Sequence, residues 1–212
     1  MATTHLFLLI FPLLFLAAAL NAEVLKKIQC ERGPLDVVFL VDTNDFNNTI
    51  DFNKQRSKII DIIRYLKNIS VERDISYSVI EFHRNPVILL PILSPFASQP
   101  AKVVDYIKTL ESRTKFDSSP ARALELAAKQ FINSSRVISS KLIILAHDGI
   151  STDLIAETLE AKNNLERIGV KLFAITSTTK PNLPALVGYT TNRRYVYVTE
   201  SDRDVFYEEM KR

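Results

Sequence analysis

The sequence is poor in cysteine and glycine, and these shortages argue against several classes of protein. Its 212 residues include a single cysteine, Cys30, so no disulfide bond can form within the chain. A loop that cradles phosphates needs several closely spaced glycines, and only Gly33, Gly149, Gly169 and Gly188 are present. The sequence also has no Gly-x-Ser-x-Gly elbow and no Cys/His nucleophile pair. We therefore predict that the protein is not an enzyme.

Neither sign of charge is in large excess. The formal net charge is +3, and no basic stretch is interleaved with aromatic residues, which argues against nucleic-acid binding. Hydrophobic residues make up 47% of the chain, enough for a real core, and charged residues make up 24%, an ordinary share. This length and composition predict one domain plus a short processed segment.

The first part of the chain differs from the rest. Residues 1–22 contain no Asp, Glu, Lys or Arg, and they are almost entirely apolar from Leu6 to Leu20. This pattern predicts a secretory signal peptide over 1–22, followed by a short polar leader over 23–33. An uncleaved signal anchor is the weaker alternative, because the apolar run is short for a membrane span. No later segment is long and apolar enough to cross a bilayer, so we expect a secreted, extracellular protein.

Two further features bear on secretion. Sequons predict N-linked glycosylation at Asn47, Asn68 and Asn133. An odd cysteine in a secreted protein can pair with another chain, so Cys30 could form an intermolecular disulfide and a disulfide-linked oligomer. A free thiol in a short N-terminal segment is the alternative, and the sequence leaves both open.

Strand-like and helix-like segments alternate after residue 34, which predicts an α/β fold. We expect a doubly wound, mostly parallel sheet of about six strands with helices on both faces. The segment 87–90 should pair with 75–82 as one antiparallel edge strand. Ser118 or Ser119 should cap the helix that begins at Pro120. The other strands are expected at 35–42, 141–146, 170–175 and 195–198, and the helices at 52–67, 103–110, 120–131, 152–167, 183–187 (a single turn) and 202–210.

Two of these predicted strands end on aspartates. The apolar run before Asp42 and the run before His147 and Asp148 both read as buried parallel strands. Ligands of open α/β sheets bind outside the carboxyl ends of the strands. The two carboxylates therefore suggest a site for a hard cation such as Mg²⁺, which prefers oxygen ligands.

These motifs, in this order, resemble the von Willebrand factor type A (VWFA) domain, and the resemblance covers nearly all of residues 34–212. In that family three loops form a metal-ion-dependent adhesion site. Asp42 matches the first loop, where Asn44 replaces one serine and Phe46, which offers no ligand, replaces another. Ser118 takes the place of the ligand threonine in the second loop, and Asp148 matches the Asp-Gly of the third.

The resemblance implies metal ligands at Asp42, Asn44, Ser118 and Asp148. Because Phe46 removes one oxygen, the site should bind Mg²⁺ or Mn²⁺ weakly or not at all. Alternatively, the aspartates serve only as turn and cap residues. We interpret His147, which replaces a threonine of the family, as a structural histidine that is hydrogen-bonded to a neighbouring loop.

The resemblance also implies a function. Proteins of this family act in cell adhesion and the extracellular matrix, so we expect a non-enzymatic module that binds an extracellular protein through the loops around Asp42 and Asp148. The alternative is a structural assembly subunit that oligomerises through Cys30 or an edge strand and keeps a vestigial metal site.

Overall fold

The computed structural model describes the greater part of the chain. Contacts between residues divide the chain into two compact units, residues 1–33 and 34–212, and the fold below is that of the second unit. The signal peptide, the leader up to residue 32 with Cys30, and the loop residues Phe46 and Asn47 lie outside the described residues. The described ranges are 33–44, 49–69, 73–113 and 117–211.

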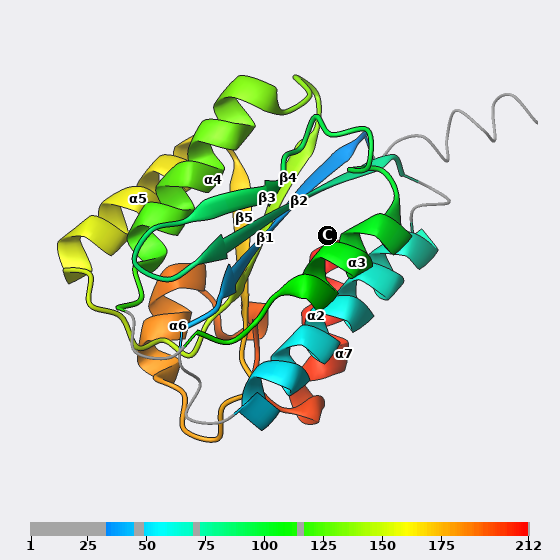
Figure 1. The fold of residues 1–212 in the computed structure, drawn as a ribbon. Coiled ribbons are helices and arrows are strands. Elements are labelled where there is room, and N and C mark those ends of the chain that lie inside the picture. The colour runs from blue at the N-terminus through cyan, green and yellow to red at the C-terminus, as the bar shows by residue number, and fades with distance from the viewer. Residues whose placement is uncertain (1–32, 45–48, 70–72, 114–116, 212) are drawn as a thin grey trace, which may run out of the picture. The chain divides into compact units, whose positions relative to one another are not determined.

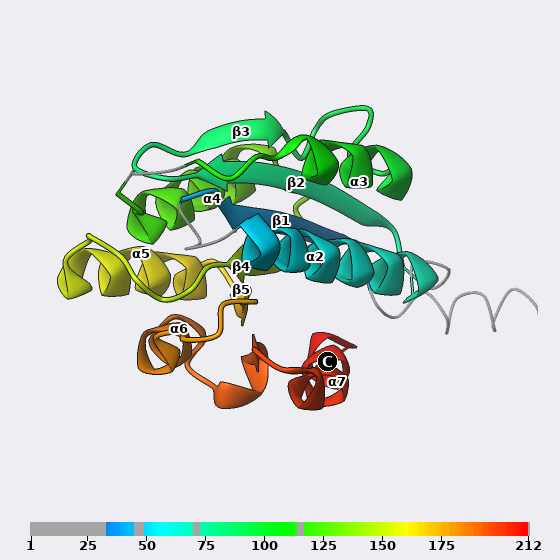
Figure 2. The same ribbon diagram turned by 60° about the horizontal axis from the view of Figure 1, so that its bottom comes forward.

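A six-stranded sheet in the order β3-β2-β1-β4-β5-β6 forms the centre of the fold. All neighbouring strands are parallel except β3, which pairs antiparallel with β2 at one edge. Figure 2 shows this order from β3 through β2, β1 and β4 to β5. The predicted fold class, including its antiparallel edge strand, is therefore confirmed. The strands are β1 (Leu35–Asp42), β2 (Ile75–Phe82), β3 (Val87–Leu90), β4 (Ser140–Ala146), β5 (Val170–Ile175) and β6 (Val196–Tyr197).

Helices cover both faces of this sheet (Figure 1). One face carries α2, α3 and α7, and the other carries α4, α5 and α6. Two short 3₁₀ turns, Arg193–Tyr195 and Glu200–Asp202, lie on either side of β6. The helices are α2 (Thr49–Ile69), α3 (Pro100–Thr109), α4 (Pro120–Ser134), α5 (Ile155–Arg167), α6 (Leu183–Thr190) and α7 (Arg203–Lys211).

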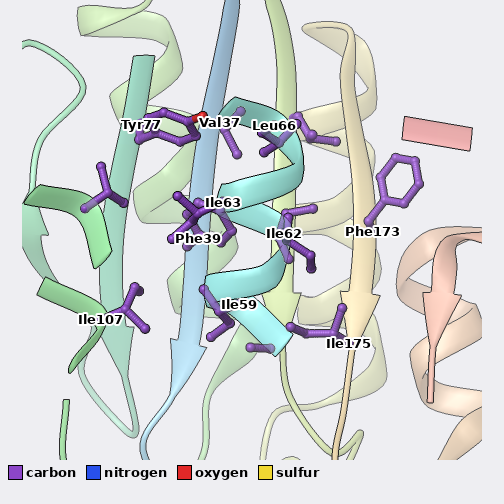
Figure 3. Close-up of a cluster of buried hydrophobic side chains, with 14 of the residues drawn as sticks. Val37, Phe39, Ile59, Ile62, Ile63, Leu66, Tyr77, Ile107, Phe173 and Ile175 are labelled. Atoms are coloured by element: carbon purple, nitrogen blue, oxygen red, sulfur yellow. The ribbon is translucent and has the colours of Figure 1, made fainter. Parts of the chain in front are cut away.

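Alternation along β1 explains the two layers. Successive side chains of a strand point to opposite faces, so Val37 and Phe39 join the α2 side of the core while Val38 and Leu40 join the α4 side. Figure 3 shows α2 presenting the fully buried Ile59, Ile62, Ile63 and Leu66 to the sheet. These positions follow helical spacing, so one stripe of α2 faces the core.

The two ends of α5 differ in how well they match the prediction. Gly169 ends α5 as predicted: it has φ +76°, and its N–H donates to the carbonyl of Glu166 at 3.0 Å. The predicted start of α5 was wrong, because the helix begins at Ile155 and not at 152. There the carboxylate of Glu157 accepts the N–H of Leu154 at 3.1 Å, which satisfies a donor at the helix entrance.

A buried ion pair fixes the end of the sheet that lies away from the predicted site. Asp36 of β1 is fully buried and accepts hydrogen bonds from the side chains of Ser135, Ser139 and Arg136. Burial alone would raise the pKa of Asp36, but these hydrogen bonds outweigh it and hold the pKa below its usual value. Arg136 also pairs with the exposed carboxylate of Asp74.

Candidate functional site at the carboxyl ends of strands β1 and β4

The candidate site lies where two central strands end side by side. Val41 of β1 pairs with Ala146 of β4, so Asp42 and His147 follow at the same edge of the sheet. The chain passes from β1 to β2 on one side and returns to β4 on the other, which makes this the switch point of the strand order. Open α/β sheets bind ligands at such a point.

Asp42 is buried and its carboxylate is already well supplied with hydrogen bonds. Its Oδ1 accepts the backbone N–H of Asn44 at 2.9 Å. Its Oδ2 accepts the hydroxyl of Ser118 at 2.8 Å and lies 2.7 Å from Nδ1 of His147. An ionised carboxylate only accepts hydrogen bonds, so Nδ1 carries the proton in this contact.

His147 is fully buried at the centre of the site. Its ring lies between the aromatic rings of Phe82 and Tyr189, at centroid distances of 5.9 and 6.0 Å. Its Nε2 is buried and has no hydrogen-bond partner among the described residues. The contact with Asp42 is the bond to a neighbouring loop that the sequence suggested. That the ring would lie close to the carboxylates of both aspartates could not be predicted from the sequence.

Asp148 is the more accessible of the two aspartates, with 23% of its side chain exposed. Its Oδ1 accepts the N–H of Ile150 at 2.8 Å and lies 3.6 Å from Nδ1 of His147. The following residue, Gly149, has φ +85°, and a Cβ there would lie 2.5 Å from the carbonyl oxygen of Asn182. Only glycine fits this turn, so Gly149 fixes the position of Asp148.

Asp42, His147 and Asp148 form a cluster that could hold a metal ion. Each offers one ligand atom, and these atoms all lie within 4.8 Å of one another. The hydroxyl of Ser118 is a further oxygen beside Asp42. Two carboxylates, one imidazole and one hydroxyl are a donor set that suits a divalent cation. The structure thus brings together three of the four predicted ligands and adds His147.

Asn44, the fourth predicted ligand, is held by its backbone beside the same loop. It forms an isolated parallel bridge with Arg113, whose N–H donates to the carbonyl of Thr43 at 2.7 Å. The guanidinium of Arg113 pairs with Glu81 at 2.9 Å, which ties this loop to β2. Asn44 therefore contributes a backbone donor to Asp42, and its role as a ligand stays a prediction.

Asp153 is a residue of the site that sequence reasoning missed. Its carboxylate accepts the hydroxyl of Ser119 at 2.6 Å and the N–H of Ala121 at 2.7 Å. Ser119 occupies the N-cap position of α4 as predicted, but its side chain forms no capping hydrogen bond, and the carboxylate of Asp153 supplies the cap. The hydroxyls of Ser118 and Ser119 bind Asp42 and Asp153 instead. A Ser-Thr-Asp run after Asp148 was the available signal, but its partner helix begins more than thirty residues earlier.

The loops of the site are also joined through their backbones. The carbonyl of Ser118 accepts the N–H of Thr152 at 3.1 Å, and the carbonyl of Asp148 accepts the N–H of Asn182 at 2.8 Å. The loop before α4 and the loop before α6 are therefore both anchored to the segment that follows β4. These anchors hold the loops in place around the cluster.

Among the helices of the described residues, none combines the length and apolar character that crossing a membrane requires.

Comparison with known proteins places the chain in a family. The model of the von Willebrand factor type A domain matches residues 36–208. The chain therefore belongs to the von Willebrand factor type A domain family, whose modules typically mediate protein interactions. No curated protein matches the sequence.

Solved structures show the same fold at low sequence identity. The conserved hypothetical protein BatB from Bacteroides thetaiotaomicron has a TM-score of 0.65 at 15% identity, over 84% of this chain and 97% of that one. Proximal thread matrix protein 1 from the mussel byssus was solved with zinc in its metal-ion-dependent adhesion site (MIDAS) motif. It has a TM-score of 0.65 at 16% identity, over 82% of this chain and 46% of that one. Manganese-loaded TRAP protein from Plasmodium vivax has a TM-score of 0.63 at 17% identity, over 82% of this chain and 71% of that one.

Proposed function

We propose that the protein is a secreted, non-enzymatic module that binds an extracellular protein partner through the loops around Asp42 and Asp148. One observation carries the proposal: a cluster of two carboxylates and an imidazole lies at the switch point of a type A domain. The side chain of Asp148 is partly exposed to solvent, at 23%, whereas that of Asp42 is buried. A partner would therefore approach from the Asp148 side.

The donor set favours a weakly bound divalent cation. Asp42, His147 and Asp148 would hold it, with Ser118 beside them. A bound cation would supply positive charge for an acidic side chain of the partner. Imidazole suits zinc, whereas the carboxylates suit manganese and magnesium, which prefer oxygen ligands. The zinc and manganese in the two structurally similar proteins support such metals here.

Binding should be weak because the site is satisfied without a metal. Asp42 already accepts hydrogen bonds from Asn44, Ser118 and His147. For Nδ1 to bind a cation, His147 must give up its hydrogen bond to Asp42. That loss offsets part of what the new ligand bond contributes.

Calorimetric titration with Zn²⁺, Mn²⁺ and Mg²⁺ tests this part of the proposal. We expect saturable binding of Zn²⁺ and Mn²⁺, weaker binding of Mg²⁺, and loss of all three in Asp148→Ala. The Asp148→Asn variant is the matched control for folding, because it keeps the oxygen that accepts the N–H of Ile150. If none of the three ions binds the unchanged protein, the metal site is vestigial.

Secretion and glycosylation belong to the same proposal. Asn68 and Asn133 are exposed near the carboxyl ends of α2 and α4. The neighbouring Ser135 contacts Asp36, which is at the amino end of β1 and so far along the strand from Asp42. Glycans there would leave the candidate site clear. Expression in eukaryotic cells, followed by enzymatic deglycosylation and mass spectrometry of the medium, tests both points.

The second candidate function is that of a structural assembly subunit. The edge strand β3 presents exposed Val87 and Ile88, which favours pairing with another chain. Cys30 would supply a disulfide to that chain. Sedimentation of the secreted protein and of a Val87→Lys variant, together with non-reducing electrophoresis, decides this. A monomer under all conditions would remove this candidate.

A further inference from the structure

A pocket lies directly beside the candidate cation site. Its volume is about 480 Å³, within the range of ligand pockets, and it lies between α5, α6 and the loop that follows Asp148. Its lining includes Gly149 and Ile150, the two residues after that aspartate. Ile155 and Leu159 of α5 form one wall, and Ala185 of α6 lies on another. Figure 2 shows α5 and α6 neighbouring each other on the same side of the sheet.

The polar groups of this pocket are paired within the protein. Asp153 accepts hydrogen bonds from Ser119 and Ala121. Lys162 is mostly buried and pairs with Glu166 at 3.0 Å. The hydroxyl of Tyr189 interacts with the side chains of Ser151 and Thr158, and burial, followed by the charges of Asp153 and Asp148, raises its pKa to about 12. With Asp153 hydrogen-bonded and Lys162 ion-paired within the protein, the pocket suits an uncharged, apolar guest.

Apolar side chains that line or adjoin the pocket are also exposed to solvent. Ile150, Leu154 and Ile155 are 60%, 67% and 80% exposed, and Leu159 is 45% exposed. All four lie within ten residues of the chain, next to the candidate site. A group of exposed apolar side chains around a pocket is typical of protein–protein contact sites. A small molecule inside the pocket would leave this rim uncovered, so a protein fits the surface better.

We infer that this pocket receives a large apolar side chain of the same protein partner whose carboxylate reaches the cation site. The inference rests on the proposed function, and it adds a second specificity element to it. Asp148 and Ile150 are two residues apart, so neighbouring residues of one extended partner segment can reach both features. The partner segment then carries an acidic residue flanked by leucine, isoleucine, methionine or phenylalanine.

Gly188 offers a way to fill the pocket without harming the fold. It lines the pocket from α6, and a Cβ built on it meets no atom within 4 Å. Leucine is also a better helix former than glycine, so Gly188→Leu should be at least as stable as the unchanged protein. Gly188→Ala is the matched control, because it makes the same backbone change with little added volume.

The experiment measures the binding of labelled peptides by fluorescence anisotropy, with zinc present and with protein expressed from the full sequence in insect cells. The probe is Gly-Leu-Asp-Leu-Gly. All three peptides are amidated at the C-terminus; Gly-Ser-Asp-Ser-Gly lacks the apolar side chains, and Gly-Leu-Asn-Leu-Gly lacks the carboxylate. Because burying a leucine side chain is strongly favourable, we expect the probe to bind about tenfold more tightly than the serine peptide. Gly188→Leu should abolish that difference, and Gly188→Ala should keep most of it.

The outcomes separate the two proposals. Equal binding of the leucine and serine peptides overturns the pocket, while weaker binding of the asparagine peptide still supports carboxylate recognition. Equal binding of the aspartate and asparagine peptides overturns carboxylate recognition, and a loss in Gly188→Leu then still supports the pocket. An undiminished preference for leucine in Gly188→Leu, or no binding of any peptide, overturns the pocket inference.

Discussion

Nδ1 of His147 lies 2.7 Å from Oδ2 of Asp42, in a buried contact between residues 105 positions apart. This hydrogen bond places the imidazole ring against the buried carboxylate of the candidate cation site. The ring therefore stabilises the buried carboxylate when no cation is present. It also offers a nitrogen ligand when one arrives, which changes the expected metal preference of the site.

Replacement of His147 by threonine should change metal selectivity. The variant loses the nitrogen ligand, so Zn²⁺ affinity should fall by at least about tenfold, while Mg²⁺ affinity should be unchanged or higher. Competition of each ion with a fluorescent chelator measures both. His83→Asn is the control for a histidine outside the cluster, and it should leave both affinities unchanged. An unaltered Zn²⁺ affinity in His147→Thr would show that the imidazole is no ligand.

Removal of the Asp153 carboxylate should destabilise the loops and helix α4 together. Asp153→Ala loses the bonds to Ser119 and Ala121, and a lost helix cap typically costs about 1–2 kcal/mol. Urea unfolding followed by circular dichroism measures this. Asp117→Ala removes an exposed carboxylate just before the same helix and should change stability by less than about 0.5 kcal/mol. Equal effects of the two variants would contradict the capping role.

Gly149→Ala should be strongly destabilising. The new Cβ would lie 2.5 Å from the carbonyl oxygen of Asn182, and φ is +85°. The steric overlap and the unfavourable backbone angle together should lower the free energy of unfolding by about 2 kcal/mol or more. Gly188→Ala, where the added Cβ has free space within a helix, should instead be neutral or stabilising by about 0.5–1 kcal/mol. Thermal unfolding of the two variants compares them, and similar melting temperatures would count against the close contact.

Asp36 should make stability depend on acid pH. Its pKa in the folded protein is lowered below 3.8, so the carboxylate binds protons less readily in the folded than in the unfolded state. The stabilisation is therefore fully present above the unfolded pKa, and it is lost as pH falls below about 3.8 through the folded pKa. Asp36→Asn should unfold at lower urea concentration at neutral pH and lose less stability on acidification.

Asp74 is the matched control for Asp36, because it pairs with the same Arg136 but its side chain is 71% exposed. Breaking a buried ion pair typically costs about 3–5 kcal/mol, whereas an exposed pair contributes about 1 kcal/mol or less. Urea unfolding of Asp36→Asn and Asp74→Asn across acid and neutral pH measures the difference. Equal losses in the two variants would show that burial of Asp36 is not what matters.

Much of the fold could be predicted from local pattern. The apolar run ending at Asp42 forms β1 over the expected residues, and 87–90 forms the antiparallel edge strand β3. Gly169 ends α5 as its position suggested. These features depend on neighbouring residues in the chain, through strand alternation, buried runs and the conformational freedom of glycine. The helix boundaries were less predictable, because the carboxylates of Glu157 and Asp153 accept backbone N–H groups from outside the periodic pattern.

The candidate site also has some features that could be predicted from local sequence and others that could not. The sequence by itself determined the strand-terminal aspartates, because a buried strand that ends in a polar loop is a local feature. Tertiary structure alone decided that His147 binds Asp42, that Asp153 caps α4, and that a pocket opens beside Asp148. Each of these depends on which strands lie side by side and how the loops between them pack. That arrangement is set by burial of the whole core, so no single segment of the sequence encodes it.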